Sequence, residues 1–88
     1  MKTIYKYQLK LEESQTLNLT KSYQILSVQL QSSALCLWAI VDPQMDLEKV
    51  EILVVGTGRP LPDGQLDYLA TVQHGMFVWH IFLKLSSA

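Results

Sequence analysis

Apolar and polar residues alternate along most of the chain, and this period of two residues predicts β-strands rather than helices. Near the start, for example, Tyr5, Tyr7 and Leu9 fall on one side, while Lys6 and Gln8 fall on the other. Similar segments follow, so we expect strands at residues 3–11, 15–19, 24–31, 34–42, 49–57, 66–73 and 76–85. The pattern predicts an all-β protein, a small antiparallel β-sandwich or partly open barrel of six to seven short strands without a long helix.

The connections between these segments carry turn signals. Ser32 and Ser33 predict a tight hairpin, although the pair lacks the glycine that such turns favour, and His74 with Gly75 predicts a second hairpin turn. Residues 42–48 predict a polar loop with one helical turn, capped by Asp42. Within residues 24–31, alternation places Leu26 on the inward face together with the other apolar residues of that strand.

Two of the segments, residues 35–41 and 77–85, are apolar on both faces, which is typical of strands that are covered on both sides. The 88-residue chain is long enough for one domain, residues 1–88, with 49% hydrophobic but only 17% charged residues. An average soluble domain has about 25% charged residues. We therefore expect a homo-oligomer in which Trp38 and Trp79 contribute to the subunit interface, with the loop at residues 56–65 at its rim.

Charge and motifs exclude several classes of protein. The net charge of −1 argues against nucleic acid as a partner, because phosphate neutralisation requires a basic surface. No apolar run approaches the length of a membrane span, and Lys6, Gln8 and Lys10 interrupt any signal peptide. A lone Cys36 forms no internal disulfide, so we expect a cytoplasmic protein without membrane contact.

The loop at residues 56–65 is the first candidate binding site, because it combines three glycines and two prolines with an arginine. It matches neither a P-loop nor a dinucleotide fingerprint, since no helix follows. Its glycines would let backbone N–H groups approach an anion, and the candidate contacts are Gly56, Thr57, Gly58 and Arg59. The alternative is a rigid connection in which Arg59 is solvated or paired with Asp63 or Asp67.

Aromatic residues and a histidine complete the candidate ligand contacts. A nucleobase stacks well on Trp38, Trp79 or Tyr68, whereas core or interface packing is the alternative for each of these rings. His80 lies on an apolar strand, where it serves either as a ligand contact or as a hydrogen-bonded structural residue. It forms no metal-site spacing with His74, so we expect no metal and no cofactor. No combination of nucleophile, base and orienting group is evident, so we expect no enzyme.

Five segments of the chain resemble a family of short phage and bacterial proteins that form a domain of unknown function. The resemblance is carried by TIYKY at residues 3–7, ILSVQ at 25–29, LCLWA at 35–39, GTGRP at 56–60 and GMFVWHIF at 75–82. It implies a phage or prophage setting, in which small proteins block a host defence protein or sequester a nucleotide signal. It brings no catalytic residues.

Three functions therefore remain open from the sequence. The first is a phage-type counter-defence protein that binds and sequesters a small anionic, nucleotide-derived ligand as a homo-oligomer. The second is an inhibitor that docks on a host defence protein through an apolar patch or a free edge strand. The third is a structural protein that acts only by self-association.

Overall fold

The computed structural model of the protein describes residues 1–85 and consists of seven β-strands with no helix in that range. The prediction of an all-β fold is therefore confirmed. In chain order the strands are β1 (Thr3–Leu9), β2 (Ser14–Thr20), β3 (Gln24–Gln31), β4 (Ala34–Val41), β5 (Leu47–Gly56), β6 (Leu66–His74) and β7 (Phe77–Lys84).

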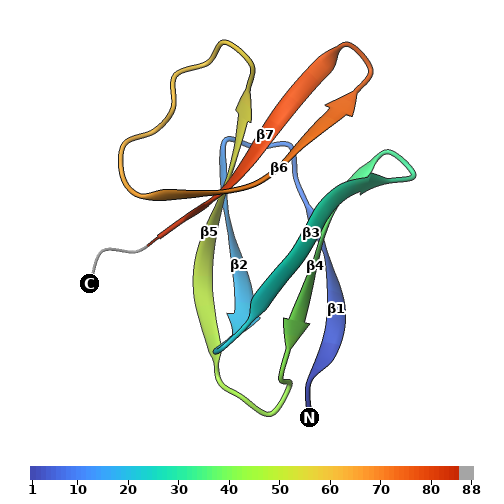
Figure 1. Cartoon of the computed structure of the whole chain (residues 1–88), viewed down its shortest axis with the longest axis vertical. Coiled ribbons are helices and arrows are strands. Elements are labelled where there is room, and N and C mark those ends of the chain that lie inside the picture. Colours follow the sequence, from blue (N-terminus) through green and yellow to red (C-terminus); the bar gives the residue numbers. More distant parts are fainter. Residues whose placement is uncertain (86–88) are drawn as a thin grey trace.

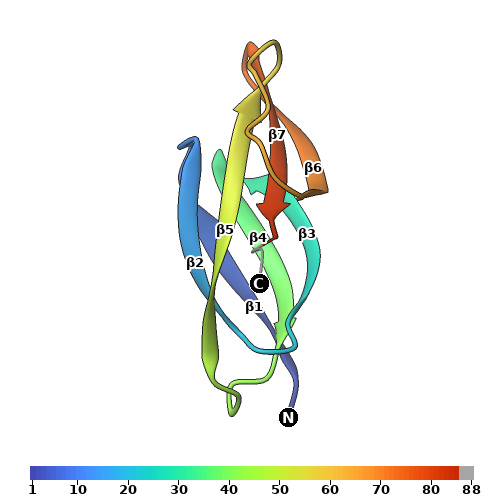
Figure 2. The same cartoon turned by 90° about the vertical axis from the view of Figure 1, so that its left-hand side faces the viewer.

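The strands form two antiparallel sheets that pack face to face as an open sandwich rather than a closed barrel (Figure 2). Sheet A has the order β1-β4-β3, and sheet B has the order β2-β5-β7-β6. The β6–β7 hairpin and the loop after β5 lie at one end of the molecule, which we call the upper end, and the N-terminus lies at the lower end (Figure 1). The fold is thin, with extents of 40 × 34 × 15 Å, so the core is a single layer between the sheets.

The core consists of the alternate side chains that both sheets direct inward. Apolar burial of this kind is the main favourable term in folding, at about 25 cal/mol per Å². The buried cluster is Leu9, Val28, Leu35, Leu37, Ala39 and Val41 from sheet A, with Ile52, Val54, Val72, Ile81 and Leu83 from sheet B.

The central strand of sheet A, β4, has apolar residues on both faces, as predicted, but its two faces differ. Leu37 and its inward neighbours belong to the core, whereas Cys36 and Trp38 point outward. Cys36 is nevertheless only 2% exposed. Its cross-strand neighbours are Gln8 and Gln29, so long polar side chains flank it on both sides.

A β-bulge between Ile25 and Ser27 corrects the predicted orientation at the start of β3, whereas Val28 and Leu30 face the core as predicted. The bulge inserts one extra residue, which shifts the alternation and places Leu26 on the surface with 46% exposure. Ile25 packs against the core instead. A second bulge between Tyr68 and Ala70 has the opposite effect, because Leu69 packs against the core there.

The predicted hairpin at Ser32 and Ser33 is confirmed, and both residues adopt positive φ angles, 50° and 69°, without a glycine. The second hairpin turn is one residue later than predicted. His74 is the last residue of β6 and pairs with Phe77, so Gly75 and Met76 form the turn. Gly75 supplies the positive φ of 62°.

The predicted helical turn after β4 is a β-turn instead. The N–H of Met45 donates to the carbonyl oxygen of Asp42 at 2.9 Å, and the N–H of Gln44 donates to Oδ1 of Asp42 at 3.1 Å. Asp42 therefore caps a turn of four residues, and β5 begins soon afterwards at Leu47.

Candidate functional site

The start of the glycine-rich loop is a tight turn rather than an open anion cradle. The N–H of Arg59 donates to the carbonyl oxygen of Gly56 at 3.1 Å, and Gly58 adopts a φ of 89°. The N–H of Thr57 donates to the carbonyl oxygen of Val78 at 3.3 Å. The amides of Thr57 and Arg59, two of those expected to face an anion, are thus engaged within the protein, and the Arg59 side chain is the charged contact that this turn offers.

Trp79 and Arg59 lie against Gly56, the last residue of β5 and the direct partner of Trp79 in β7. A Cβ atom at Gly56 would lie 3.3 Å from Cζ3 of Trp79 and 3.6 Å from Cγ of Arg59. The lack of a side chain there lets the indole ring and the Arg59 stem approach the backbone. The structure therefore brings Gly56, Arg59 and Trp79 together, as the candidate site requires.

Two hollows share these three residues at the upper end of the molecule. The first, of about 430 Å³, lies between the β1–β2 connection and the loop after β5, and we call it the Leu11 hollow. It exists because β2 pairs with β5 only as far as Leu53, which leaves the last residues of β5 without a β2 partner. Glu12 and Glu13 also line it, so this hollow has two acidic residues and Arg59 in its lining.

The second hollow, of about 400 Å³, lies between the Gly56–Arg59 turn and the β6–β7 hairpin, and we call it the Phe77 hollow. Its lining comprises Gly56, Thr57, Arg59, Met76, Phe77, Val78 and Trp79, so Arg59 carries its only charge. Phe77 stacks on Trp79 with a centroid distance of 5.7 Å and an interplanar angle of 22°. Phe77 remains 63% exposed, so one aromatic face is available to a ligand.

Arg59 forms no ion pair within residues 1–85, where the single ion pair joins the N-terminus to Asp42. The predicted alternative pairing of Arg59 with Asp63 or Asp67 is thus absent from the described part of the chain. An unpaired guanidinium is a strong donor to carboxylate or phosphate, and Arg59 lines both hollows. Glu12 and Glu13 line only the Leu11 hollow, so the Phe77 hollow suits an anion better.

The indole N–H of Trp79 is a buried donor without a partner among the described residues. Leaving such a group unsatisfied costs about 1–3 kcal/mol. Trp79 nevertheless packs against the core cluster, so its ring serves as a wall of both hollows and as part of the sandwich.

A chain of hydrogen bonds joins three other candidate residues on the outer face of sheet B. Nε2 of His80 lies 2.8 Å from Oγ1 of Thr57, and Nδ1 of His80 lies 3.0 Å from Oγ1 of Thr71. Thr71 in turn contacts the hydroxyl of Tyr68 at 2.7 Å. These contacts fix the imidazole ring and tie the Gly56–Arg59 turn to sheet B, which makes them positioning contacts rather than a surface for stacking.

Trp38 lies apart from the other candidate residues. It belongs to β4 and pairs with Lys6 and Ser27 on the outer face of sheet A. Trp79 belongs to sheet B and packs toward the core. The two tryptophans therefore belong to different sheets of one copy, which periodicity alone did not reveal, and their expected contribution to a subunit interface stays a prediction.

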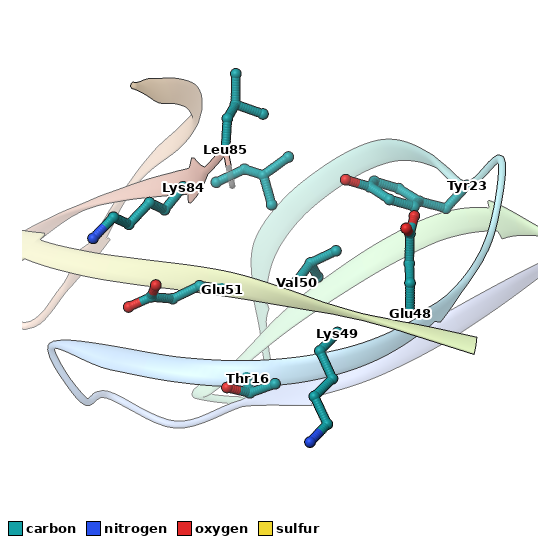
Figure 3. A pocket seen from close by; sticks show the side chains of 9 residues that line it. Thr16, Tyr23, Glu48, Lys49, Val50, Glu51, Lys84 and Leu85 are labelled. Carbon is teal, nitrogen blue, oxygen red and sulfur yellow. The ribbon is translucent and has the colours of Figure 1, made fainter. Parts of the chain in front are cut away.

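A third hollow, of about 440 Å³, is not predicted from the sequence, and we call it the Tyr23 hollow (Figure 3). Tyr23 and Glu48 lie on one side of it, Lys84 and Leu85 lie on the other, and Val50 lies between them. Burial raises the pKa of the Tyr23 phenol, and the carboxylates of Glu48 and Asp67 raise it further. The sequence contains no motif for this site, because it arises only from the relative lengths of β5 and β7.

Comparison with known proteins identifies the family. A family model described as "Domain of unknown function (DUF7352)" matches residues 1–88. The chain belongs to this family. No curated protein and no solved structure is significantly similar to the chain. Within residues 1–85, no helix is long and apolar enough to cross a membrane, and no group of His, Cys, Asp and Glu residues is arranged to hold a metal ion.

Proposed function

We propose that this protein is a non-catalytic binding module that captures a small anionic, nucleotide-derived ligand in the Phe77 hollow. The observation that carries the proposal is the position of an Arg59 side chain without an ion-pair partner in residues 1–85, beside the stacked pair of Phe77 and Trp79. A guanidinium binds phosphate with two parallel hydrogen bonds, and an exposed ring binds a base by stacking, at about 1–3 kcal/mol per base.

The kind of groups that line the hollow supports the proposal of capture without chemical change. An arginine and four apolar side chains are groups that bind and orient a ligand, whereas the Thr57 hydroxyl is engaged with His80. We further propose that the protein acts as a homo-oligomer and, in a phage setting, sequesters a signal of host defence. Met76 and Phe77 are 95% and 63% exposed in one copy of the chain, which supports a second copy that covers them.

The same exposure favours a second candidate function, inhibition of a host defence protein. Met76 and Phe77 project at the tip of the β6–β7 hairpin, and exposed apolar residues of this kind often anchor protein interfaces. A protein partner would cover the Phe77 hollow, so the two candidate functions compete for one surface.

Isothermal titration calorimetry with two probes, ADP-ribose and a cyclic dinucleotide, tests the first function. We expect at least one probe to bind, and we expect Arg59→Ala and Phe77→Ala each to weaken its binding by about tenfold or more. Lys6→Ala, which removes a cation from sheet A, is the matched control and should leave affinity unchanged. Absence of binding by both probes, or an unchanged affinity in Arg59→Ala, would contradict this function.

A further inference from the structure

The Leu11 hollow combines an apolar lining with charges of both signs. Its apolar side chains come from the β1–β2 connection, from β5 and β7 and from the loop after β5, and they are Leu11, Val54, Val55, Pro60, Pro62 and Trp79. Glu12, Glu13, Gly56 and Arg59 complete the lining. The volume of about 430 Å³ lies near the lower end of the range for ligand pockets, about 300–1,000 Å³, so the hollow suits one small molecule.

Hydrogen bonds hold the β1–β2 connection in place at one side of this hollow. The side-chain amide of Gln15 accepts from the N–H of Lys10 at 2.9 Å and donates to the carbonyl oxygen of Lys10 at 2.6 Å. The N–H of Val54 donates to the carbonyl oxygen of Glu13 at 3.2 Å, which attaches the other end of the connection to β5. On the side of the loop, the two prolines restrict the backbone. A hollow with such fixed walls is formed before a ligand arrives, which lowers the entropic cost of binding.

The backbone of β5 adds a free donor to the hollow. N–H groups point alternately to the two sides of a strand, and the N–H of Val54 points to the β2 side, where it bonds to Glu13. The N–H of Gly56, two residues later, points to the same side, but the pairing of β2 with β5 has already ended at Leu53. Within residues 1–85 it has no acceptor. This N–H and the nearby Arg59 guanidinium are the kind of donors that bind a carboxylate.

The unlike charges around the hollow do not neutralise each other. Arg59 forms no ion pair with Glu12 or Glu13, since the single ion pair within residues 1–85 joins the N-terminus to Asp42. The guanidinium and the two carboxylates are therefore available to ligand groups of opposite charge. A molecule with both a carboxylate and an ammonium group matches this set, whereas a molecule with one of them leaves the other sign unmatched.

We propose that the Leu11 hollow binds a free α-amino acid with an aromatic side chain. The ligand carboxylate accepts from the N–H of Gly56 and from Arg59, and the ligand ammonium group donates to the two acidic residues of the lining. The aromatic ring packs among the two prolines and the indole of Trp79, because aromatic pairs are stabilised beyond the effect of burial. This site does not depend on the nucleotide capture proposed above, although Arg59 lines both hollows.

NMR titration of the ¹⁵N-labelled full chain with three probes tests the proposal. The probes are L-phenylalanine, N-acetyl-L-phenylalanine, which lacks the ammonium group, and L-phenylalaninamide, which lacks the carboxylate. We expect saturable shifts at the amides of residues 54–56. Affinity for phenylalanine should be about tenfold higher than for either derivative, because each derivative loses a charge-assisted contact.

Variants of the charged lining assign each contact. The double variant Glu12→Gln with Glu13→Gln should bind phenylalanine and its N-acetyl derivative equally, and both glutamates are exposed, so the core stays intact. Arg59→Ala should bind phenylalanine and its amide equally. Glu48→Gln, at the Tyr23 hollow, is the matched control and should keep the full preference for phenylalanine.

Three results would overturn the proposal. The first is a lack of saturable shifts at residues 54–56 at millimolar phenylalanine, and the second is equal affinity of the native chain for the three probes. The third is a preference over N-acetylphenylalanine that persists in the double variant. Nucleotide capture is tested separately, because the double variant should keep it: neither glutamate lines the Phe77 hollow.

Discussion

Leu26 and Leu37 are the same residue type in opposite environments. Both lie in strands of sheet A, but Leu37 is fully buried in the core, whereas Leu26 is 46% exposed at the bulge of β3. Simple alternation along residues 24–31 assigns Leu26 to the core as well. Their energetic roles differ because burial, not residue type, determines how much apolar surface is removed from water.

Replacement of each leucine by alanine measures this difference. We expect Leu37→Ala to lower the free energy of unfolding by about 2–5 kcal/mol, because it leaves a cavity between the sheets. Leu26→Ala should lower it by less than about 1 kcal/mol. Urea unfolding followed by circular dichroism provides both values, and equal losses in the two variants would show that the bulge does not expose Leu26.

At the scale of single elements, the turns of this fold depart further from common sequence preferences than its strands do. The β3–β4 hairpin turns through Ser32 and Ser33, both with positive φ, a conformation that costs a non-glycine residue about 1–2 kcal/mol. Asparagine followed by glycine is the preferred pair for such a turn. The native turn residues are therefore less favourable for the stability of this hairpin than an asparagine–glycine pair.

The double substitution Ser32→Asn with Ser33→Gly should raise the free energy of unfolding by about 1 kcal/mol, because the new pair accepts positive φ readily. The control is Ser27→Gly within β3, which should instead lower stability by about 0.5–1 kcal/mol, since glycine weakens a strand. Thermal and urea unfolding measure both. A loss of stability in the double variant would contradict the turn geometry.

The turn after β4 makes stability depend on pH through Asp42. The N–H of Gln44 holds the pKa of the Asp42 carboxyl below its usual value of 3.8, and the N-terminal ammonium group contributes in the same direction. A pKa lowered by folding stabilises the protein above pH 3.8, and this contribution is lost as the pH falls through the folded-state pKa.

Unfolding of Asp42→Asn should therefore differ from that of the native chain most clearly above pH 3.8, and the difference should shrink in more acidic solution. Asp46→Asn, in the same connection, is the control, because the Asp46 carboxylate accepts no hydrogen bond within residues 1–85. The measurement is urea unfolding across this pH range. A difference that does not change with pH would refute the role of Asp42.

The sequence predicts the strands well, because burial of one face of a strand makes apolar and polar residues alternate along it. It does not predict the bulge at Leu26, since one inserted residue shifts the alternation without a change in composition. For the site, proximity in sequence unites Gly56 and Arg59, and the β-ladder adds Trp79. The sequence also groups Trp38 with them, because sequence pattern does not specify which strands share a sheet.

At the scale of the whole molecule, the stagger of strands in sheet B creates two of the three hollows. The pairing of β5 with β2 ends at Leu53 of β5, and its pairing with β7 ends at Glu51 of β5. Each of these ends leaves a corner of the sheet incomplete. The upper corner becomes the Leu11 hollow, and the lower corner becomes the Tyr23 hollow. The Phe77 hollow lies beside the upper corner and shares Arg59 and Trp79 with it.

Native mass spectrometry of the chain purified from phage-infected cells, the setting proposed above, most directly tests the proposed capture of an anionic ligand by a homo-oligomer, since it reports subunit number and bound small molecules together. We predict a multiple of the 10.0 kDa chain mass that carries a phosphate-containing molecule, released intact on denaturation. The Arg59→Ala protein should keep the oligomer and lose the molecule. A bare monomer would contradict this function, as would a bare oligomer of the native chain, which would instead indicate a purely structural role.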